Sequence, residues 1–219
     1  MAQKSSSHIA FIGLLFLASC GSESSKSTIS QGPLPPGYVA PSPTDDLPIA
    51  DHPEYVAWSR FPVGTAVVRK KVVSNDSATI SVTTTLRLAQ KTPEKVVVES
   101  QVTVDRPEQA LVENPPMKLE FPASFRLPEG MKLEQFSLPS LRAKRIGEET
   151  RQAVGIEYKA QLFTWDEVSQ AGPMTVKLWR CYDIPGRMLR QEINGRTQTS
   201  VEEVVEIIQA DGQSSKTEN

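Results

Sequence analysis

The 219-residue sequence predicts a mainly β domain, folded as an antiparallel up-and-down curved sheet or half-barrel with little helix. Three observations predict this fold class: apolar and polar residues alternate over several runs, short polar breaks separate the runs, and no segment keeps a helical period over ten or more residues. A sheet of about seven to nine strands with one apolar face must close, curl or be covered, because soluble proteins rarely expose a large apolar patch.

Residues 1–19 have the features of an export signal peptide. Lys4 precedes an apolar run of about ten residues that begins at Ile9 and ends at Ala18. A helix needs about 20 apolar residues to span a bilayer, so this run is too short for a permanent membrane helix.

The signal segment ends in Leu17-Ala18-Ser19-Cys20, which resembles the lipobox of bacterial lipoproteins. The resemblance implies that a peptidase cuts after Ser19 and that Cys20 carries diacylglycerol on its sulfur and often palmitate on its amine. Gly21 follows the cysteine, whereas an aspartate there is associated with inner-membrane retention in enterobacterial lipoproteins. The resemblance therefore favours a lipid-anchored protein of the cell envelope, with the outer membrane facing the periplasm as its site. The alternative is an ordinary secretory signal with a chance cysteine.

Residues 20–50 are expected to form a Ser- and Pro-rich linker behind the lipidated cysteine. Proline favours extended polyproline geometry, which rises about 3.1 Å per residue and suits a spacer between the membrane and a domain. The alternative for the stretch from Pro33 to Pro36 is a ligand for a proline-recognition domain. A β-rich envelope domain over residues 51–210 and a polar tail over residues 211–219 complete the predicted organisation.

From Tyr55 onwards the pattern favours strands. Residues 65–73, 79–88 and 96–104 predict a three-stranded antiparallel meander, because Ile80, Val82, Thr84, Leu86 and Leu88 share one face. Further strands are predicted at roughly residues 143–150, 153–164, 174–182, 187–194 and 199–208.

Proline interrupts residues 106–142, where residues 119–121 and 133–138 are candidates for edge strands or for a cover over the sheet. Residues 164–170 are a candidate for a single helical turn capped by Thr164. Trp58, Trp165 and Trp179 are expected in the core or at its rim. Residues 184–187 (Ile-Pro-Gly-Arg) predict a turn.

The order of several short motifs looks like that of a group of uncharacterised bacterial envelope proteins. The motifs are Trp58, residues 61–65, 147–150 and 155–158, and residues 179–187, where an acidic residue and Pro-Gly follow a tryptophan. The layout, over roughly residues 55–208, is also similar to the half-barrel of the LolA/LolB lipoprotein-carrier fold. That resemblance implies a concave sheet face that takes an acyl chain.

Composition and residue content argue against several other classes. The formal charge of −2, or −3 without the signal segment, which holds Lys4 and no acid, gives no reason to expect nucleic acid as a partner. The mature chain has one histidine, His52, placed in the linker, so neither a Ser-His-Asp triad nor a multi-histidine metal site can be built. Cys181 is expected to be a small buried hydrophobe. Glu148 and Glu149 should point to opposite faces of a strand.

No cofactor, metal or enzymatic activity is therefore expected, and the sequence identifies no ligand-binding residue. Two functions stay open. One is a binding module that holds a lipid or other hydrophobic ligand on the curved sheet. The other is a non-catalytic structural or interaction lipoprotein that binds other envelope proteins.

Overall fold

The computed structural model describes residues 47–76, 78–107, 109, 111–169, 172–211 and 214–216. The signal segment, Cys20 and most of the expected linker lie outside the described residues, as do residues 212–213 and 217–219 of the expected tail. The chain divides into two units, Met1–Pro43 and Thr44–Asn219, and the fold below is that of the second unit.

The described residues form a mainly antiparallel β structure, which confirms the predicted fold class. In chain order the elements are β1 (Ile49–Asp51), α1 (Pro53–Ser59), β2 (Ala66–Asn75), β3 (Thr79–Lys91), β4 (Lys95–Asp105), β5 (Val112–Glu113), β6 (Met117–Pro122), β7 (Ser124–Arg126), α2 (Leu133–Ser137), β8 (Lys144–Ala153), β9 (Ile156–Ser169), β10 (Gly172–Arg180), β11 (Met188–Gly195), β12 (Gln198–Ile208) and β13 (Ser214–Lys216).

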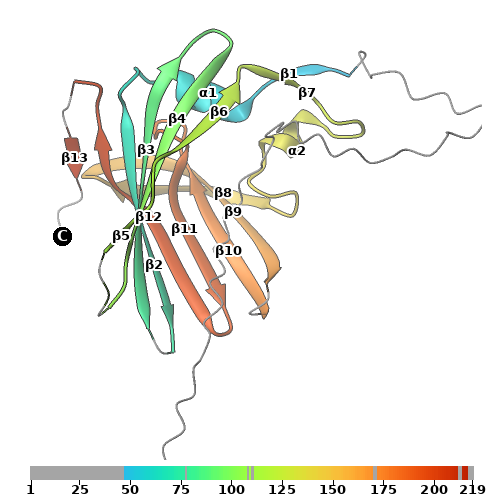
Figure 1. Ribbon diagram of the computed structural model, residues 1–219. Helices are drawn as coiled ribbons and strands as arrows, with labels where there is room; N and C mark the ends of the chain where they lie inside the picture. The colour runs from blue at the N-terminus through green and yellow to red at the C-terminus, as the bar shows by residue number, and fades with distance from the viewer. Residues whose placement is uncertain are drawn as a thin grey trace, which may run out of the picture. The chain divides into compact units, whose positions relative to one another are not determined.

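Two meanders make up the large sheet. The first is β2-β3-β4, as predicted, and the second runs from β8 to β12. They join where β2 pairs antiparallel with β12, from Asn75 opposite Gln198 to Ala66 opposite Ile208. β8 lies at one end of the sheet, while β5 and β6 pair with β4 at the other, so the sheet is not closed into a barrel (Figure 1).

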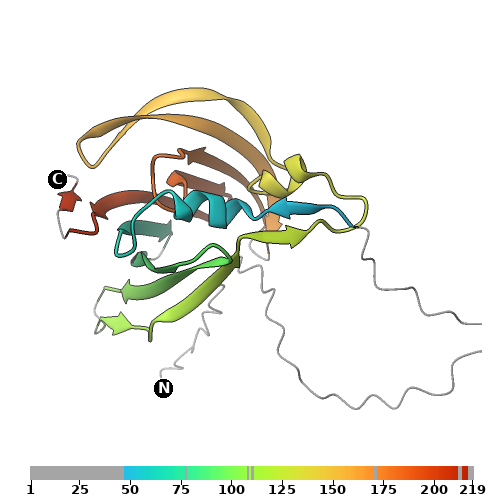
Figure 2. The same cartoon turned by 90° about the horizontal axis from the view of Figure 1, so that it is seen from above.

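Register shifts accompany the curvature of the sheet. They occur between Trp179 and Arg180 in β10 and between Val204 and Glu206 in β12, and others interrupt β3 and β8. Such bulges bend a strand and increase its twist. Seen from above, α1 lies inside the curve, between β8–β9 on one side and β4–β6 on the other (Figure 2).

Trp58 of α1 stands at the centre of the main core. Its side chain is 2% exposed and belongs to one apolar cluster with residues of β2, β3, β4, β9, β11 and β12. Trp179 (2%) is in the same cluster, and Trp165 (9%) is in a second cluster beneath residues 138–143. The prediction that the three tryptophans are core or rim residues is confirmed.

The segment between the meanders combines both roles predicted for it. Residues 119–121 lie in β6, an edge strand on β4. Residues 133–138 form α2 and its C-terminal end, and Leu138 packs on the second cluster as a cover.

Three expectations about local structure were wrong. Tyr55 lies in α1 and not in a strand; the apolar stretch is too short to show a helical period. His52 is the N-cap of that helix and not a linker residue, because its side chain accepts a hydrogen bond from the Glu54 N–H. Thr164 does not cap a helical turn: it lies inside β9, where strands on both sides bond the backbone and Phe163 and Trp165 are buried.

Folded structure also reaches into both predicted polar segments. β1 begins at Ile49 and pairs with β7, and β13 pairs with the end of β12. Pairing with β7 fixes the position of β1, the segment that directly precedes α1.

We expect Trp58→Ala to lower the free energy of unfolding by about 3–5 kcal/mol, because truncating a buried aromatic leaves a cavity in the main core. Chemical denaturation followed by circular dichroism measures the change. The control is Val168→Ala, at a side chain 76% exposed, which should stay within about 0.5 kcal/mol of wild type. Equal effects of the two variants would contradict the central position of Trp58.

Candidate functional site

Of the residues that the sequence singled out, Cys181 is placed as expected. It is unpaired and 3% exposed, directly after β10, and its N–H donates to the Arg187 carbonyl at 2.8 Å. Burial raises the pKa of its thiol above the ordinary value, so the thiolate is disfavoured. The prediction of a small buried hydrophobe is confirmed.

Glu148 and Glu149 turn to separate partners, as expected for neighbours on a strand. Glu148 accepts a hydrogen bond from Arg145 at 2.6 Å. Glu149 accepts one from the Trp179 indole N–H at 2.8 Å, and this bond is the main cause that lowers the pKa of its carboxyl. They do not form a carboxylate pair.

The predicted turn at residues 184–187 is confirmed, and its last residue has a role that the sequence did not indicate. The Arg187 N–H donates to the Ile184 carbonyl at 2.9 Å, and Gly186 has φ +69°. Arg187 itself has φ +61°, which is unfavourable for a residue with a side chain. Its side chain is only 6% exposed and forms an ion pair with Glu54 of α1.

Two further arginines lie near this ion pair. We call Arg69, Arg180 and Arg187 the arginine cluster. They come from the middle of β2, the end of β10 and the turn that follows β10. The negative charge of Glu54 raises the pKa of both Arg69 and Arg180, whereas the positive charges of Arg187 and Arg69 lower the pKa of Arg180.

Arg69 is held against the turn by neutral acceptors. Its Nη2 donates to the Gly186 carbonyl at 3.1 Å and to the Pro185 carbonyl at 3.5 Å. Its Nε is buried and has no hydrogen-bond partner among the described residues, an arrangement that costs about 1–3 kcal/mol. A Cβ at Gly186 would lie 2.7 Å from Nη2, so only glycine leaves room for this guanidinium.

Arg180 is likewise held by a backbone group, as its Nη1 donates to the Ser137 carbonyl at the end of α2 at 2.8 Å. Burial, and then the neighbouring charge of Arg187, lower the pKa of Arg180 to about 10. Burial also lowers the pKa of Arg69. A pKa of about 10 leaves Arg180 charged at neutral pH, and neither guanidinium is in an ion pair with a described carboxylate.

His52 lies at the start of α1, next to three aromatic rings. Its ring lies 5.5 Å from those of Phe121 and Phe125 and 6.1 Å from that of Phe136, measured between centroids. Burial lowers the pKa of His52, Glu54 raises it, and Arg187 lowers it. The neutral imidazole is therefore favoured, with Nδ1 free to accept the bond that caps α1.

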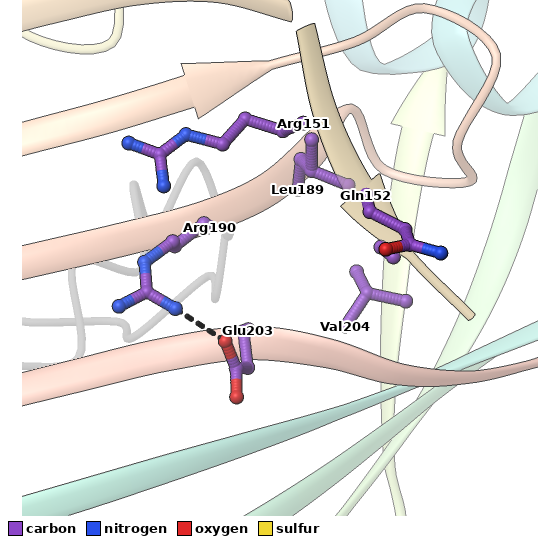
Figure 3. A pocket seen from close by; sticks show the side chains of 7 residues that line it. Arg151, Gln152, Leu189, Arg190, Glu203 and Val204 are labelled. Carbon is purple, nitrogen blue, oxygen red and sulfur yellow. Dashed lines mark hydrogen bonds and ion pairs between the residues drawn. The ribbon is translucent and has the colours of Figure 1, made fainter. Parts of the chain in front are cut away.

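A small pocket lies beside the sheet where β8 passes over β11 and β12 (Figure 3). Its volume is about 100 Å³, against roughly 300–1,000 Å³ for typical ligand sites. Arg190 in its wall is paired with Glu192 and Glu203. The lining is Arg151, Gln152, Ala153, Leu189, Arg190, Glu203 and Val204. A pocket of this size is too small for an acyl chain.

Other features of the described residues bear on the site. None of the described helices is both long and apolar enough to cross a membrane. Within the same residues, no group of three or more His, Cys, Asp or Glu side chains is arranged to hold a metal ion.

No family model and no curated protein matches the chain. Similar solved structures include a protein described as exported, with a YmcC-like fold, from Bacteroides fragilis (9% identity, 66% of this chain and 95% of that one, TM-score 0.40). Others are a protein described as a lipoprotein from Parabacteroides distasonis (10%, 66% and 95%, 0.38) and a domain described as an outer membrane lipoprotein-sorting protein from Vibrio parahaemolyticus (6%, 74% and 93%, 0.27). Similarities this low carry no conclusion about what the chain does.

We expect Glu54→Gln to destabilise the domain, because it leaves the Arg187 guanidinium buried without its counter-charge. Breaking a buried pair typically costs roughly 3–5 kcal/mol, and the lower end applies because the Glu54 side chain is 31% exposed. The matched control is Glu120→Gln, which breaks an exposed pair with Lys95 and should cost less than about 1 kcal/mol. Urea denaturation measures both, and similar losses would show that the Glu54 pair has no special weight.

Stability should fall as the pH drops from 7 towards 5.5, for a reason that involves His52. The unfolded chain has the ordinary imidazole pKa of 6.5 and the folded chain a lower one, so unfolding takes up a proton in this window. His52→Asn keeps a side chain that can cap α1 but does not titrate there, and its stability should vary less over the same range. The only other histidine of the sequence is His8, in the predicted signal segment, so an unchanged pH profile in His52→Asn would assign the dependence to other groups.

Proposed function

We propose that this chain is a lipid-anchored protein of the cell envelope whose β domain acts as a non-catalytic interaction domain. The anchor is the feature that carries the proposal: the apolar run before Leu17-Ala18-Ser19-Cys20 provides an export signal and a lipidation site. Two or three acyl chains hold a protein on a membrane essentially permanently, since each buried methylene contributes about 0.8 kcal/mol. Gly21 after the cysteine supports the outer membrane as the site.

The filled curve of the sheet supports an interaction domain over a carrier of hydrophobic ligands. The core inside the curve contains Trp58 of α1 together with Val67, Leu88 and Leu189 of the sheet, each 2% exposed or less. The pocket beside β8, of about 100 Å³, is too small for an acyl chain. A hydrophobic ligand that entered the core around Trp58 would have to displace α1 and its ion pair.

The residue types near the pocket and the turn support the non-catalytic part of the proposal. Cys181 is buried with a raised pKa, and His52 is occupied by the cap of α1. Glu149 is engaged by Trp179 and Arg151. Each of these titratable groups has a structural role in the fold.

The anchor is tested by growing cells that express the full chain in labelled palmitate. Wild type should carry the label and resist extraction by high salt, whereas Cys20→Ser should carry none, because a hydroxyl cannot replace the thioether. Cys181→Ser is the matched control and should be labelled like wild type. An unlabelled wild type, or label retained in Cys20→Ser, would disprove the anchor.

The choice between the two binding functions is tested with the full chain purified in detergent and with cells. A fluorescent fatty-acid probe should show no saturable, displaceable binding, while cross-linking in cells should recover a stoichiometric protein partner. Saturable probe binding with no protein partner would reverse the choice in favour of a hydrophobic ligand.

A further inference from the structure

The arginine cluster carries more positive charge than the described carboxylates near it compensate. Among the described residues, Arg187 is in an ion pair with Glu54, but neither Arg69 nor Arg180 is in one with a carboxylate. Glu202 acts on Arg69 only through its field, and it lies opposite Lys71 in the β2–β12 register. An excess of at least one positive charge is left in a partly buried region.

The two arginines without ion pairs also have unused donors. The Nε of Arg69 is buried and donates to no described atom. The bonds of Arg69 to described atoms go through Nη2 and that of Arg180 through Nη1. Each guanidinium has five N–H groups in a fixed plane, and those not used in these bonds can donate to a further acceptor.

Backbone groups hold the guanidinium groups in place before any ligand arrives. The carbonyls of Pro185 and Gly186 fix Arg69, and the Ser137 carbonyl fixes Arg180. The absence of a side chain at Gly186, at φ +69°, makes the approach of Arg69 feasible. Donors that are already oriented bind an anion without a large loss of side-chain entropy.

We propose that the arginine cluster is a binding site for a phosphate-type oxyanion, which accepts hydrogen bonds from Arg69 and Arg180 while Glu54 keeps Arg187 in position. A tetrahedral oxyanion suits donors that come from separate elements, because its oxygens point in different directions, whereas those of a carboxylate lie in one plane. A single negative charge balances the excess. The two sources of this chemistry are free phosphate and the phosphodiester of a lipid headgroup. The proposal does not depend on the lipid anchor.

The test uses the full chain purified in detergent. Inorganic phosphate replaces chloride at constant ionic strength, thermal unfolding gives the change in Tm, and calorimetry gives the Kd. The Tm of wild type should rise with phosphate, as for a ligand that binds only the folded state. Arg180→Gln should bind phosphate at least about tenfold more weakly, or about 1.4 kcal/mol. Arg145→Gln, on the exposed edge strand β8, is the control and should bind like wild type.

Glu54→Gln separates a binding site from a purely structural cluster. Glu54 pairs with Arg187, and its negative charge also acts on Arg69 and Arg180, so removing it should make the domain less stable without phosphate but should enlarge the rise in Tm that phosphate causes. A structural cluster would lose stability in the same variant with no greater response to phosphate than to chloride. This reading also holds if Arg180→Gln does not fold.

Short-chain phosphatidylglycerol provides the second probe. Tighter binding than inorganic phosphate identifies a lipid headgroup as the source, and weaker binding identifies free phosphate; both results support the site. The proposal is overturned if wild type responds to neither probe beyond the effect of chloride, or if Arg145→Gln weakens binding as much as Arg180→Gln.

Discussion

The inner face of the curved sheet has to be covered by apolar side chains from elsewhere in the chain, and α1 supplies them. A helix of seven residues is not stable by itself in water, because nucleation is unfavourable and few bonds follow it. Its stability comes from the burial of Trp58, from the cap at His52 and from Pro53 in the first turn. At its other end, Lys91 of β3 donates to the carbonyls of Ser59 and Phe61. The sheet and the helix thus depend on each other.

The ion pair between Glu54 and Arg187 links this helix to the far end of the sequence. Ion pairs in low-dielectric surroundings contribute little net stability, since desolvation opposes their attraction. Here the pair joins α1 to the turn between β10 and β11. A carbonyl of the same turn accepts a hydrogen bond from Arg69 of β2. The contacts that position α1 therefore also bring the arginine cluster together. As a result, the packing of α1 and the candidate anion site depend on the same residues.

Local sequence patterns predicted the strands well because their signals are local. The alternation over residues 79–88 appears as β3, and the polar breaks around Asn75 and Pro93 appear as its hairpins. α1 was missed because seven residues are too few for a helical period, although His52, Pro53 and Glu54 form a start signal that could have indicated it. The pairing of β2 with β12 could not be predicted, because their alternating patterns do not specify a partner more than a hundred residues away.

The candidate site could not be predicted from the sequence for a related reason. Arg69, Arg180 and Arg187 stand in three separate segments, each of which is an ordinary strand or turn sequence. The Pro185-Gly186 turn was predicted from its residues, but the burial of the arginine after it follows from tertiary packing against α1. The burial of a charged side chain by distant segments can be seen only in the folded structure.

Native-state hydrogen exchange of the α1 backbone tests most directly whether this helix is a fixed part of the core. The amides of Val56 and Phe61 bond to the carbonyls of His52 and Trp58. If α1 fills the curve permanently, these amides should open with a free energy close to that of the β2–β12 ladder, so that they exchange only with global unfolding. Exchange of Val56 and Phe61 by orders of magnitude faster than the ladder, with the sheet still protected, would contradict the account and make the interior of the curve accessible.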